Sequence, residues 1–284
     1  MIAILMSTYN GEEYLREQVD SLLGQTEKDW QLFVRDDGSR DGTVGILREY
    51  ASAYPAKVHL LEERKENLGA GVSFMYLLEA VEADYYMFCD QDDVWMSDKV
   101  ERTLSKMRSL EAGSGADCPV GVFTDLTVVD SNLEVLYPSL WKADGRHPEY
   151  VRDFYRQWTN RHATYGCTQM LNRAAKSAVL PYRQFPGVMG AHDNWAAYIL
   201  IHDGVYDYLD EPTILYRQHS RNVAGANMGK GEKEEVRYVL RSPSSLIAKL
   251  RKDYRRSRLM PFRVSYTRIL WMRIVQSLKS IIKS

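Results

Sequence analysis

Short apolar runs alternate with segments of helical character through the first 95 residues of the chain. Each run ends at a turn signal, which predicts buried strands at residues 2–6, 30–34, 58–61 and 85–89. The segments between them are predicted to form helices over residues 12–25, 41–54 and 67–81. Alternation of strand and helix is typical of a parallel sheet with helices on both faces.

The second half of the chain follows a less regular pattern. We expect strands at residues 120–124, 126–129 and 213–216, and a helix that begins near His192. Three segments have loop character, at residues 112–117, 145–153 and 224–233. From residue 234 onward the pattern is helical, with Pro243 and Pro261 as breaks.

A polar cluster follows each of the four predicted N-terminal strands, at residues 7–10, 36–39, 67–71 and 90–93. The carboxyl ends of parallel strands lie along one edge of a sheet, and ligands of open α/β sheets bind beyond that edge. The spacing therefore predicts a binding or active site built from these clusters.

Asp90 and Asp92 are the candidates for a metal site. Carboxylates two positions apart on an extended segment point the same way, and they can hold a divalent cation with a diphosphate as further ligand. Such a cation neutralises charge on a leaving phosphate. A solvated acidic turn is the alternative, and the position at a strand end favours the metal site.

Asp37, in the second cluster, is a candidate for reading a nucleotide. Its carboxylate can accept a hydrogen bond from the ring N–H of a pyrimidine or from a ribose hydroxyl. Because Asp and Ser also favour helix caps, a capping turn is the alternative.

Charge is distributed unevenly along the 284 residues, whose formal net charge is only −1. Residues 236–284 contain thirteen Lys or Arg and a single acid, Asp253. Apolar residues in this tail recur near helical spacing, which is typical of a helix lying in an anionic membrane interface. The alternative is that the stripe packs on the rest of the chain or pairs in a homodimer. No recognisable nucleic-acid-binding fold accompanies the charge, so we expect no nucleic-acid partner.

The three cysteines form neither a disulfide framework nor a zinc pattern, as expected of a protein in a reducing cytoplasm. No signal peptide is expected at residues 1–6, and no stretch approaches the roughly 18 apolar residues of a spanning helix.

The polar clusters resemble the motifs of family-2 inverting glycosyltransferases, which have the GT-A fold. They read STYNG at residues 7–11, RDDGSRDGT at 35–43, ENLGAG at 66–71 and DQDDVW at 90–95. Later segments are similar to bacterial rhamnosyltransferases that build cell-wall polysaccharides, O-antigens and capsules: YGCTQMLNRA at residues 165–174, AHDNW at 191–195 and YRQHSRNVAGA at 216–226.

The resemblance implies a Rossmann-like, mostly parallel α/β sheet flanked by helices, with a helical C-terminal extension. Residues 1–226 would form the GT-A catalytic domain, with residues 1–100 as its nucleotide-sugar half and 101–226 as its acceptor half. Residues 227–284 would form the basic, amphipathic extension.

The resemblance also implies roles for single residues on the donor side. Ser7, Tyr9 and Asp37 would surround the nucleotide base, Asn67 would lie beside the donor, and Gln91 would contact it.

Two further groups of residues complete the implied site. Asp90, Asp92 and His219 would bind Mn²⁺ or Mg²⁺ and the diphosphate, and neutral imidazole suits Mn²⁺ better. Arg217 could bind the diphosphate in a bidentate manner.

Asp193 matches the catalytic base, which takes the proton of the acceptor hydroxyl. A carboxylate that opens a helix is also favoured by the helix dipole, so a capping role is the alternative.

The implied donor is dTDP-β-L-rhamnose, and the implied acceptor is a lipid-linked glycan at the inner face of the cytoplasmic membrane. A UDP-glucose, UDP-galactose or UDP-N-acetylhexosamine donor is the alternative on the same fold. A nucleotide-binding module without catalysis is the hypothesis from another class, and the acids at positions 90, 92 and 193 argue against it.

Overall fold

The computed structural model of the chain describes residues 1–61, 66–115, 117–160, 162–182, 192–219 and 243–282. The expected boundary between residues 226 and 227 and the expected loop at residues 224–233 lie outside these residues.

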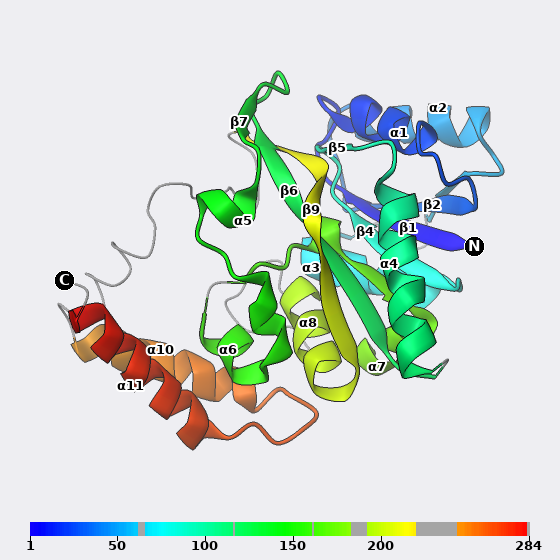
Figure 1. The fold of residues 1–284 in the computed structure, drawn as a ribbon. Helices are drawn as coiled ribbons and strands as arrows, with labels where there is room; N and C mark the ends of the chain where they lie inside the picture. The colour runs from blue at the N-terminus through cyan, green and yellow to red at the C-terminus, as the bar shows by residue number, and fades with distance from the viewer. Residues whose placement is uncertain (62–65, 116, 161, 183–191, 220–242, 283–284) are drawn as a thin grey trace.

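The N-terminal half has the predicted alternation of strand and helix. Four strands run parallel in the spatial order β3-β2-β1-β4 (Figure 1). They are β1 (Ile2–Thr8), β2 (Trp30–Asp36), β3 (Val58–Leu60) and β4 (Tyr85–Cys89). The connecting helices are α1 (Leu15–Leu23), α2 (Thr43–Ala53) and α3 (Ala70–Ala80).

The sheet is mixed, whereas the sequence predicted a mostly parallel one. β8 (Met170–Asn172) lies between β4 and β6 (Val120–Val129) and pairs antiparallel with both. β8 therefore runs opposite to its two neighbours, which share one direction. Beyond it, β6 is parallel to β9 (Val205–Arg217), and β5 (Val94–Trp95) is antiparallel to β9. β7 (Val135–Tyr137) forms a hairpin with β6.

β6 is a single fully buried strand where the sequence predicted two short ones. Its register with β9 shifts at Asp125. The Asp125 carboxylate there accepts hydrogen bonds from the N–H groups of Leu126 and Trp141 at 2.8 and 3.2 Å. The side chain thus satisfies backbone donors at the irregularity, and the strand continues through it.

Helices cover both faces of the sheet. On one face, α1, α2 and α4 (Lys99–Ser114) close over an apolar cluster that includes Ile4 and Leu32. On the other, α3, α7 (Arg173–Val179) and α8 (His192–Asp203) close over a cluster that includes Leu5. Because side chains alternate along a strand, consecutive residues of β1 serve opposite faces.

α4 extends into the segment that the sequence predicted as a loop at residues 112–117. It ends at Gly115, whose φ of 93° lies in the left-handed region that glycine adopts without steric cost. The short elements α5 (Leu140–Ala143), η1 (Pro148–Arg152), α6 (Phe154–Thr159) and η2 (Gly166–Thr168) fill the connection from β7 to β8.

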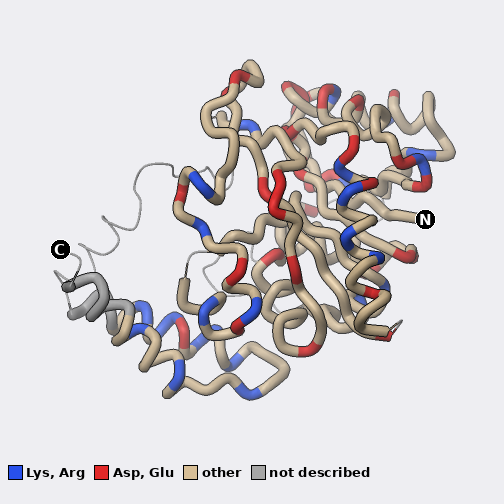
Figure 2. Tube along the Cα trace, viewed as in Figure 1, with Lys and Arg blue, Asp and Glu red and all other residues tan. Residues whose placement is uncertain are grey.

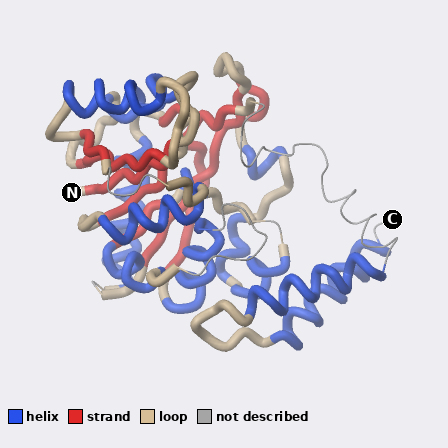
Figure 3. Tube along the Cα trace, turned by 180° about the vertical axis from the view of Figure 1, so that it is seen from behind, coloured by secondary structure: helices blue, strands red, loops and turns tan. Residues whose placement is uncertain are grey.

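The C-terminal helices α10 (Pro243–Ser257) and α11 (Tyr266–Ile282) form a pair that packs against α6 (Figures 1 and 3). Ile269 of α11 is fully buried in the apolar cluster that α3, α7 and α8 cover. Asp253 is also buried and pairs with Arg273 at 2.9 Å, and Arg273 donates to the carbonyl of Thr159 at 2.6 Å. One side of the tail therefore packs on the domain, which is one of the alternatives that the sequence left open.

None of the helices in the described part of the chain is long and apolar enough to cross a bilayer.

Candidate active site

The carboxyl ends of β1, β2 and β4 meet at one edge of the sheet, and the end of β9 joins them there. Arg217, the last residue of β9, bonds to the segment that follows β4, and residues at the end of β1 bond to segments that follow β2 and β4. Polar clusters far apart in the sequence are therefore neighbours at this edge, as the strand pattern predicts.

Asp37 lies just beyond β2, and its carboxylate is buried. Oδ1 accepts hydrogen bonds from Nη1 of Arg35 at 2.5 Å and from the N–H of Leu68 at 2.7 Å. Oδ2 accepts from the N–H of Gly69 at 2.8 Å, and the Asn67 side-chain amide donates to the Asp37 carbonyl at 2.9 Å. Asp37 and Asn67, two residues predicted to bind the nucleotide sugar, are thus held together by hydrogen bonds.

Ser7 joins the same network through Ser73 of α3. Its hydroxyl donates to the Ser73 hydroxyl at 2.7 Å, and Nη1 of Arg35 donates to that hydroxyl at 2.9 Å. Nη2 of Arg35 reaches the carbonyl of Glu66 at 2.6 Å. Arg35 is fully buried. It bonds directly to Asp37, and it is connected to Ser7 through Ser73 and to Asn67 through Asp37.

Tyr9 is held against Gln91 by two hydrogen bonds. Its N–H donates to Oε1 of Gln91 at 2.8 Å, and Nε2 of Gln91 donates to the Tyr9 carbonyl at 3.0 Å. A Cβ at Gly11 would lie 2.3 Å from Oε1 of Gln91, so a larger residue there would displace the Gln91 side chain from these two hydrogen bonds. The Tyr9 side chain itself remains about half exposed, at 48%.

The acidic segment after β4 is partly withdrawn from solvent. Burial raises the pKa of Asp90 to about 7, and the neighbouring charge of Asp92 adds to this shift. Burial also raises the pKa of Asp93 well above its usual range. Oδ1 of Asp93 accepts the N–H of Arg217 at 3.1 Å, whereas its buried Oδ2 has no hydrogen-bond partner among the described residues.

Asp92 faces His219, which lies two residues beyond β9. Oδ2 of Asp92 is 2.8 Å from Nε2 of His219. The imidazole is stacked on the ring of Tyr14 with 4.9 Å between centroids. The predicted metal residues Asp92 and His219 are therefore direct neighbours, and Tyr14 limits the orientation of the imidazole.

Arg217 is buried and holds the acidic segment in place. Nε donates to the Asp92 carbonyl at 2.9 Å and Nη1 to the Ser131 carbonyl at 2.5 Å. Nη2 pairs with the carboxylate of Glu17, and the guanidinium lies 4.5 Å from the centroid of the Tyr14 ring. These hydrogen bonds fix the acidic segment, and the contact of Arg217 with the diphosphate stays a prediction.

Asp193 is the second residue of α8, and it is partly buried. The N–H and side-chain amide of Asn194 donate to Oδ1 at 2.7 and 3.1 Å. Burial raises the pKa of Asp193 to about 7 despite these bonds and a further one from the backbone of Gly166. The charge of Asp193 also raises the pKa of Asp90, so the two carboxyl groups are within electrostatic reach.

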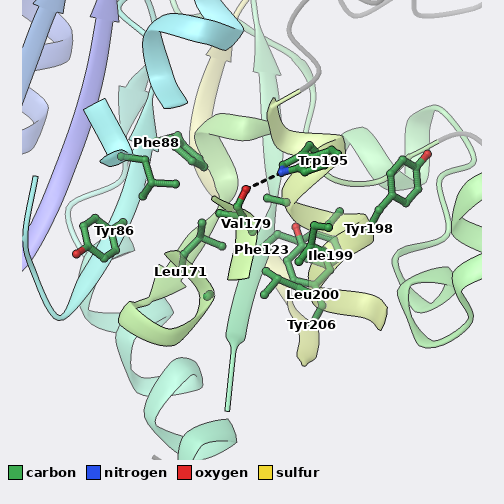
Figure 4. Close-up of a cluster of buried hydrophobic side chains, with 14 of the residues drawn as sticks. Tyr86, Phe88, Phe123, Leu171, Val179, Trp195, Tyr198, Ile199, Leu200 and Tyr206 are labelled. Atoms are coloured by element: carbon green, nitrogen blue, oxygen red, sulfur yellow. Dashed lines mark hydrogen bonds between the residues drawn. The ribbon is translucent and has the colours of Figure 1, made fainter. Parts of the chain in front are cut away.

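The start of α8 is fixed by aromatic packing. The indole N–H of Trp195 donates to the Val179 carbonyl at 2.7 Å (Figure 4). His192 stacks on Phe74 with 4.6 Å between centroids and meets the edge of Phe88 at 4.9 Å. His192 therefore packs in the core and supports Asp193 from the neighbouring position.

Cys167 of η2 is fully buried and contacts the acidic segment. One ligand atom from each of Cys167, Asp90 and Asp93 lies within 4.8 Å of the others, so the single S–H proton can be donated to one of the two carboxyl groups at a time. Burial raises the pKa of the Cys167 thiol, so it remains a protonated donor. η2 thus contacts the acidic segment through Cys167 and Asp193 through Gly166.

The donor atoms suit a hard divalent cation. Adjacent ligands of an octahedral ion at about 2.1 Å lie about 3 Å apart, close to the 2.8 Å between Asp92 Oδ2 and His219 Nε2. Repulsion between the carboxyl groups of Asp90, Asp92 and Asp93 contributes to the raised pKa values of Asp90 and Asp93, and a bound cation would relieve it. Oδ2 of Asp93 is buried and has no hydrogen-bond partner among the described residues. The more exposed Asp92 and His219 fit such an ion better than the fully buried Cys167, since they lie where a diphosphate can reach.

The model of glycosyl transferase family 2 matches residues 3–177 of the chain. The chain belongs to this family. It is a glycosyltransferase, and relatives of known name support this assignment. It is 31% identical to the dTDP-rhamnosyl transferase RfbG of Shigella flexneri over 234 residues, which cover 78% of this chain and 74% of that protein. It is 34% identical to the putative teichuronic acid biosynthesis glycosyltransferase TuaG of Bacillus subtilis over 107 residues, or 38% of this chain and 42% of that one.

Solved structures share the GT-A fold of the chain. The Staphylococcus aureus TarS fragment 1–349 with UDP-GlcNAc has a TM-score of 0.54 at 18% identity, covering 99% of this chain and 71% of the other. The mannosyltransferase PcManGT of Pyrobaculum calidifontis with GDP-Man and Mn²⁺ has a TM-score of 0.54 at 15% identity, covering 99% and 74%.

Sequence reasoning missed the residues that hold the site together. Arg35 stands inside a quoted motif, but its position in a mostly apolar strand gave no sign of its partners. Tyr14 and Glu17 lie within the predicted helix at residues 12–25, and nothing in that pattern distinguishes them from the other helix residues. Their partners at the end of β9 are about 200 residues away, which no local pattern can reveal.

Proposed function

We propose that this glycosyltransferase moves L-rhamnose from dTDP-β-L-rhamnose to an acceptor hydroxyl with inversion, which gives an α-linked product. The relationship to a dTDP-rhamnosyl transferase over 78% of the chain supports the choice of sugar. The observation that carries the proposal of catalysis is the convergence of Asp92, His219 and Asp90 with Asp193 at one edge of the sheet.

The nucleotide would lie against the ends of β1 and β2. The Asp37 carboxylate accepts bonds from Arg35 and two backbone N–H groups, and Oδ2 has only one of these donors. A carboxylate oxygen accepts more than one hydrogen bond, so Oδ2 can also accept the ring N–H of thymine or uracil. We propose that Ser7, Tyr9 and Asn67 complete this pocket and that Gln91 shapes the passage to the diphosphate.

Asp92, Asp90 and His219 would hold Mn²⁺ or Mg²⁺ next to the diphosphate. The bound cation supplies neutralisation of the charge that develops on the leaving nucleoside diphosphate. Arg217 and Tyr14 position these ligands, because the first fixes the backbone of Asp92 and the second stacks on His219.

Asp193 would be the base. Its carboxylate takes the proton of the acceptor hydroxyl while that oxygen bonds to the anomeric carbon and the bond to the diphosphate breaks. A pKa of about 7 suits this task, because the carboxylate is then populated at neutral pH and still has appreciable basicity.

We further propose that the acceptor is a lipid-linked glycan and that the enzyme works in the cytoplasm at the inner face of the membrane. The cationic character of the C-terminal helices supports this location. The alternative is that these helices pair in a homodimer.

Thermal unfolding with a panel of nucleotide sugars tests the donor. Ligands that bind only the native state raise the melting temperature, so dTDP-β-L-rhamnose with Mn²⁺ should give the largest shift. A larger shift and faster turnover with UDP-glucose, UDP-galactose or UDP-N-acetylglucosamine would assign that sugar nucleotide as the donor. The proposed transfer with inversion would still stand. Binding without any transfer or hydrolysis of labelled donor would favour a nucleotide-binding module.

A further inference from the structure

The α10–α11 pair has a second side, which faces away from the catalytic domain and carries large apolar side chains. Ile247 and Tyr254 of α10 are 50% and 51% exposed, and Trp271 and Ile274 of α11 are 65% and 37% exposed. Isolated exposed apolar residues are ordinary, but a group on one pair of helices indicates an interaction site.

Helix geometry places these four residues on one surface. Ile247 and Tyr254 are seven positions apart, and Trp271 and Ile274 are three apart, so each couple lies on one face of its helix. Asp253 and Ile269 mark the opposite, buried faces of the two helices. Because the helices run antiparallel, as the contact of Tyr254 with Tyr266 near the turn shows, Ile274 lies toward the Ile247 end of α10.

The α10–α11 pair is rich in cations, some of which face solvent and some the rest of the chain. Residues 247–275 contain nine Lys or Arg and a single acid, the buried Asp253 (Figure 2). Three exposed cations lie on α10, namely Arg251, Lys252 and Arg255, and a fourth, Arg258, follows directly after it. Within the described residues, no salt bridge joins any of these four to a carboxylate.

We propose that the outward face of the α10–α11 pair is the docking surface of the enzyme for a bilayer that contains anionic lipid. Trp and Tyr are the side chains that favour the headgroup boundary, and Lys and Arg beside them attract anionic headgroups. The inference rests on the proposed lipid-linked acceptor and names the part of the molecule that brings the enzyme to it.

Charge argues against a second copy of the chain as the occupant. In a twofold dimer the same surface meets itself, so Arg251, Lys252, Arg255 and Arg258 would face the same four cations. Such like charges repel each other, whereas an anionic bilayer complements all of them.

Trp271 is a built-in probe for this docking. The other five tryptophans, at positions 30, 95, 141, 158 and 195, are at most 3% exposed. Quenching of tryptophan fluorescence by brominated lipid in phosphatidylglycerol vesicles should therefore report on Trp271 of the full chain. The Trp271→Phe variant should bind the vesicles and lose most of this quenching.

Two triple variants test the charge, with the same change in net charge. Arg251→Gln/Lys252→Gln/Arg255→Gln should weaken binding to these vesicles about a hundredfold, since each cation near an anionic surface contributes about fivefold. The control Arg48→Gln/Arg108→Gln/Arg152→Gln changes exposed cations on α2, α4 and η1 and should bind as the parent does. Both variants should retain transfer to a soluble acceptor analogue.

The outcomes separate this proposal from the proposed function. Loss of vesicle binding in the α10 variant, with transfer to the soluble analogue retained, supports the docking surface. If both triple variants bind the vesicles equally weakly, or if the brominated lipid does not quench Trp271, the proposed docking surface is wrong. A dimer in sedimentation velocity that Trp271→Glu dissociates would assign the surface to a second copy instead. Absence of transfer in every protein, the parent included, would reject the proposed function and leave the vesicle result standing.

Discussion

Oδ2 of Asp92 and Nε2 of His219 lie 2.8 Å apart, although 127 positions separate the two residues in the chain. The contact joins the segment after β4 to the segment after β9 at the proposed metal site. The Asp92→Asn variant should therefore lose transfer while it keeps the melting temperature of the parent. Metal titration of turnover checks this, and full activity of the variant or of the parent in chelator would refute the assignment.

Tyr14 should affect the metal site without touching the metal. Its ring supports both His219 and the Arg217 guanidinium, so Tyr14→Leu should raise the Mn²⁺ concentration for half-maximal rate. We expect about a tenfold rise, the lower end of the usual effect of altering a group that orients a ligand. Turnover at saturating Mn²⁺ should stay near that of the parent. An unchanged metal requirement would show that the stacking does not position His219.

The pH profile should report Asp193. Burial raises its pKa to about 7, and a general base must be deprotonated, so kcat/KM should rise as pH increases through about 7 and then level off. The profile should be measured at saturating metal, because a bound cation keeps the nearby Asp90 deprotonated. Asp193→Asn should reduce turnover at least about a hundredfold and remove this rise. A variant that retains the rise in its residual rate would assign the titration to another group.

Arg35 should matter for both stability and donor binding. Arg35→Met leaves the buried Asp37 carboxylate without its ion pair, which should cost about 3–5 kcal/mol of unfolding free energy. Arg16→Met is the matched control, because the Arg16–Glu49 pair is largely exposed and solvent screens its attraction, so its loss should change the unfolding free energy little. Denaturant unfolding of both variants checks the difference, and similar losses would show that burial of the pair is unimportant.

The milder Arg35→Lys variant tests the effect on the donor. Lys keeps the charge but lacks the planar fork that reaches Asp37, Ser73 and Glu66 together. We expect a higher KM for the nucleotide sugar with a smaller effect on kcat, because the network lies where the nucleotide is proposed to bind and not beside Asp193. A selective loss of kcat would place Arg35 nearer to the chemistry than the structure does.

Periodicity predicted the N-terminal elements well because each strand and helix there is built from local contacts. The four parallel strands and the polar clusters at their ends follow from apolar runs and turn signals alone. β8 was missed because three residues are too short for a pattern, and that strand makes the sheet mixed. The helical tail was predicted as amphipathic, but its two faces could not be assigned, since burial of Ile269 depends on a distant domain surface.

Some residues of the candidate site could be predicted from the sequence, and others could not. The acids at positions 37, 90, 92 and 193 stand in short motifs and could be named from the sequence. Arg35 and Tyr14 could not, because their importance lies in side-chain contacts across distant segments. Arg217 could be named from the sequence as a diphosphate contact, but its hydrogen bonds to protein carbonyls and to the Glu17 carboxylate could not be foreseen, because they join segments far apart in the chain.

The most direct test of the account is the transfer reaction itself. The full chain is incubated with dTDP-β-L-rhamnose, Mn²⁺ and a lipid-linked or soluble glycan acceptor, and the product is characterised by NMR of its anomeric centre. We predict release of dTDP and an α-linked rhamnoside, both abolished by chelator and by Asp92→Asn. A β-linked product, or transfer that is indifferent to chelator and to Asp92→Asn, would contradict the account of metal-assisted inversion.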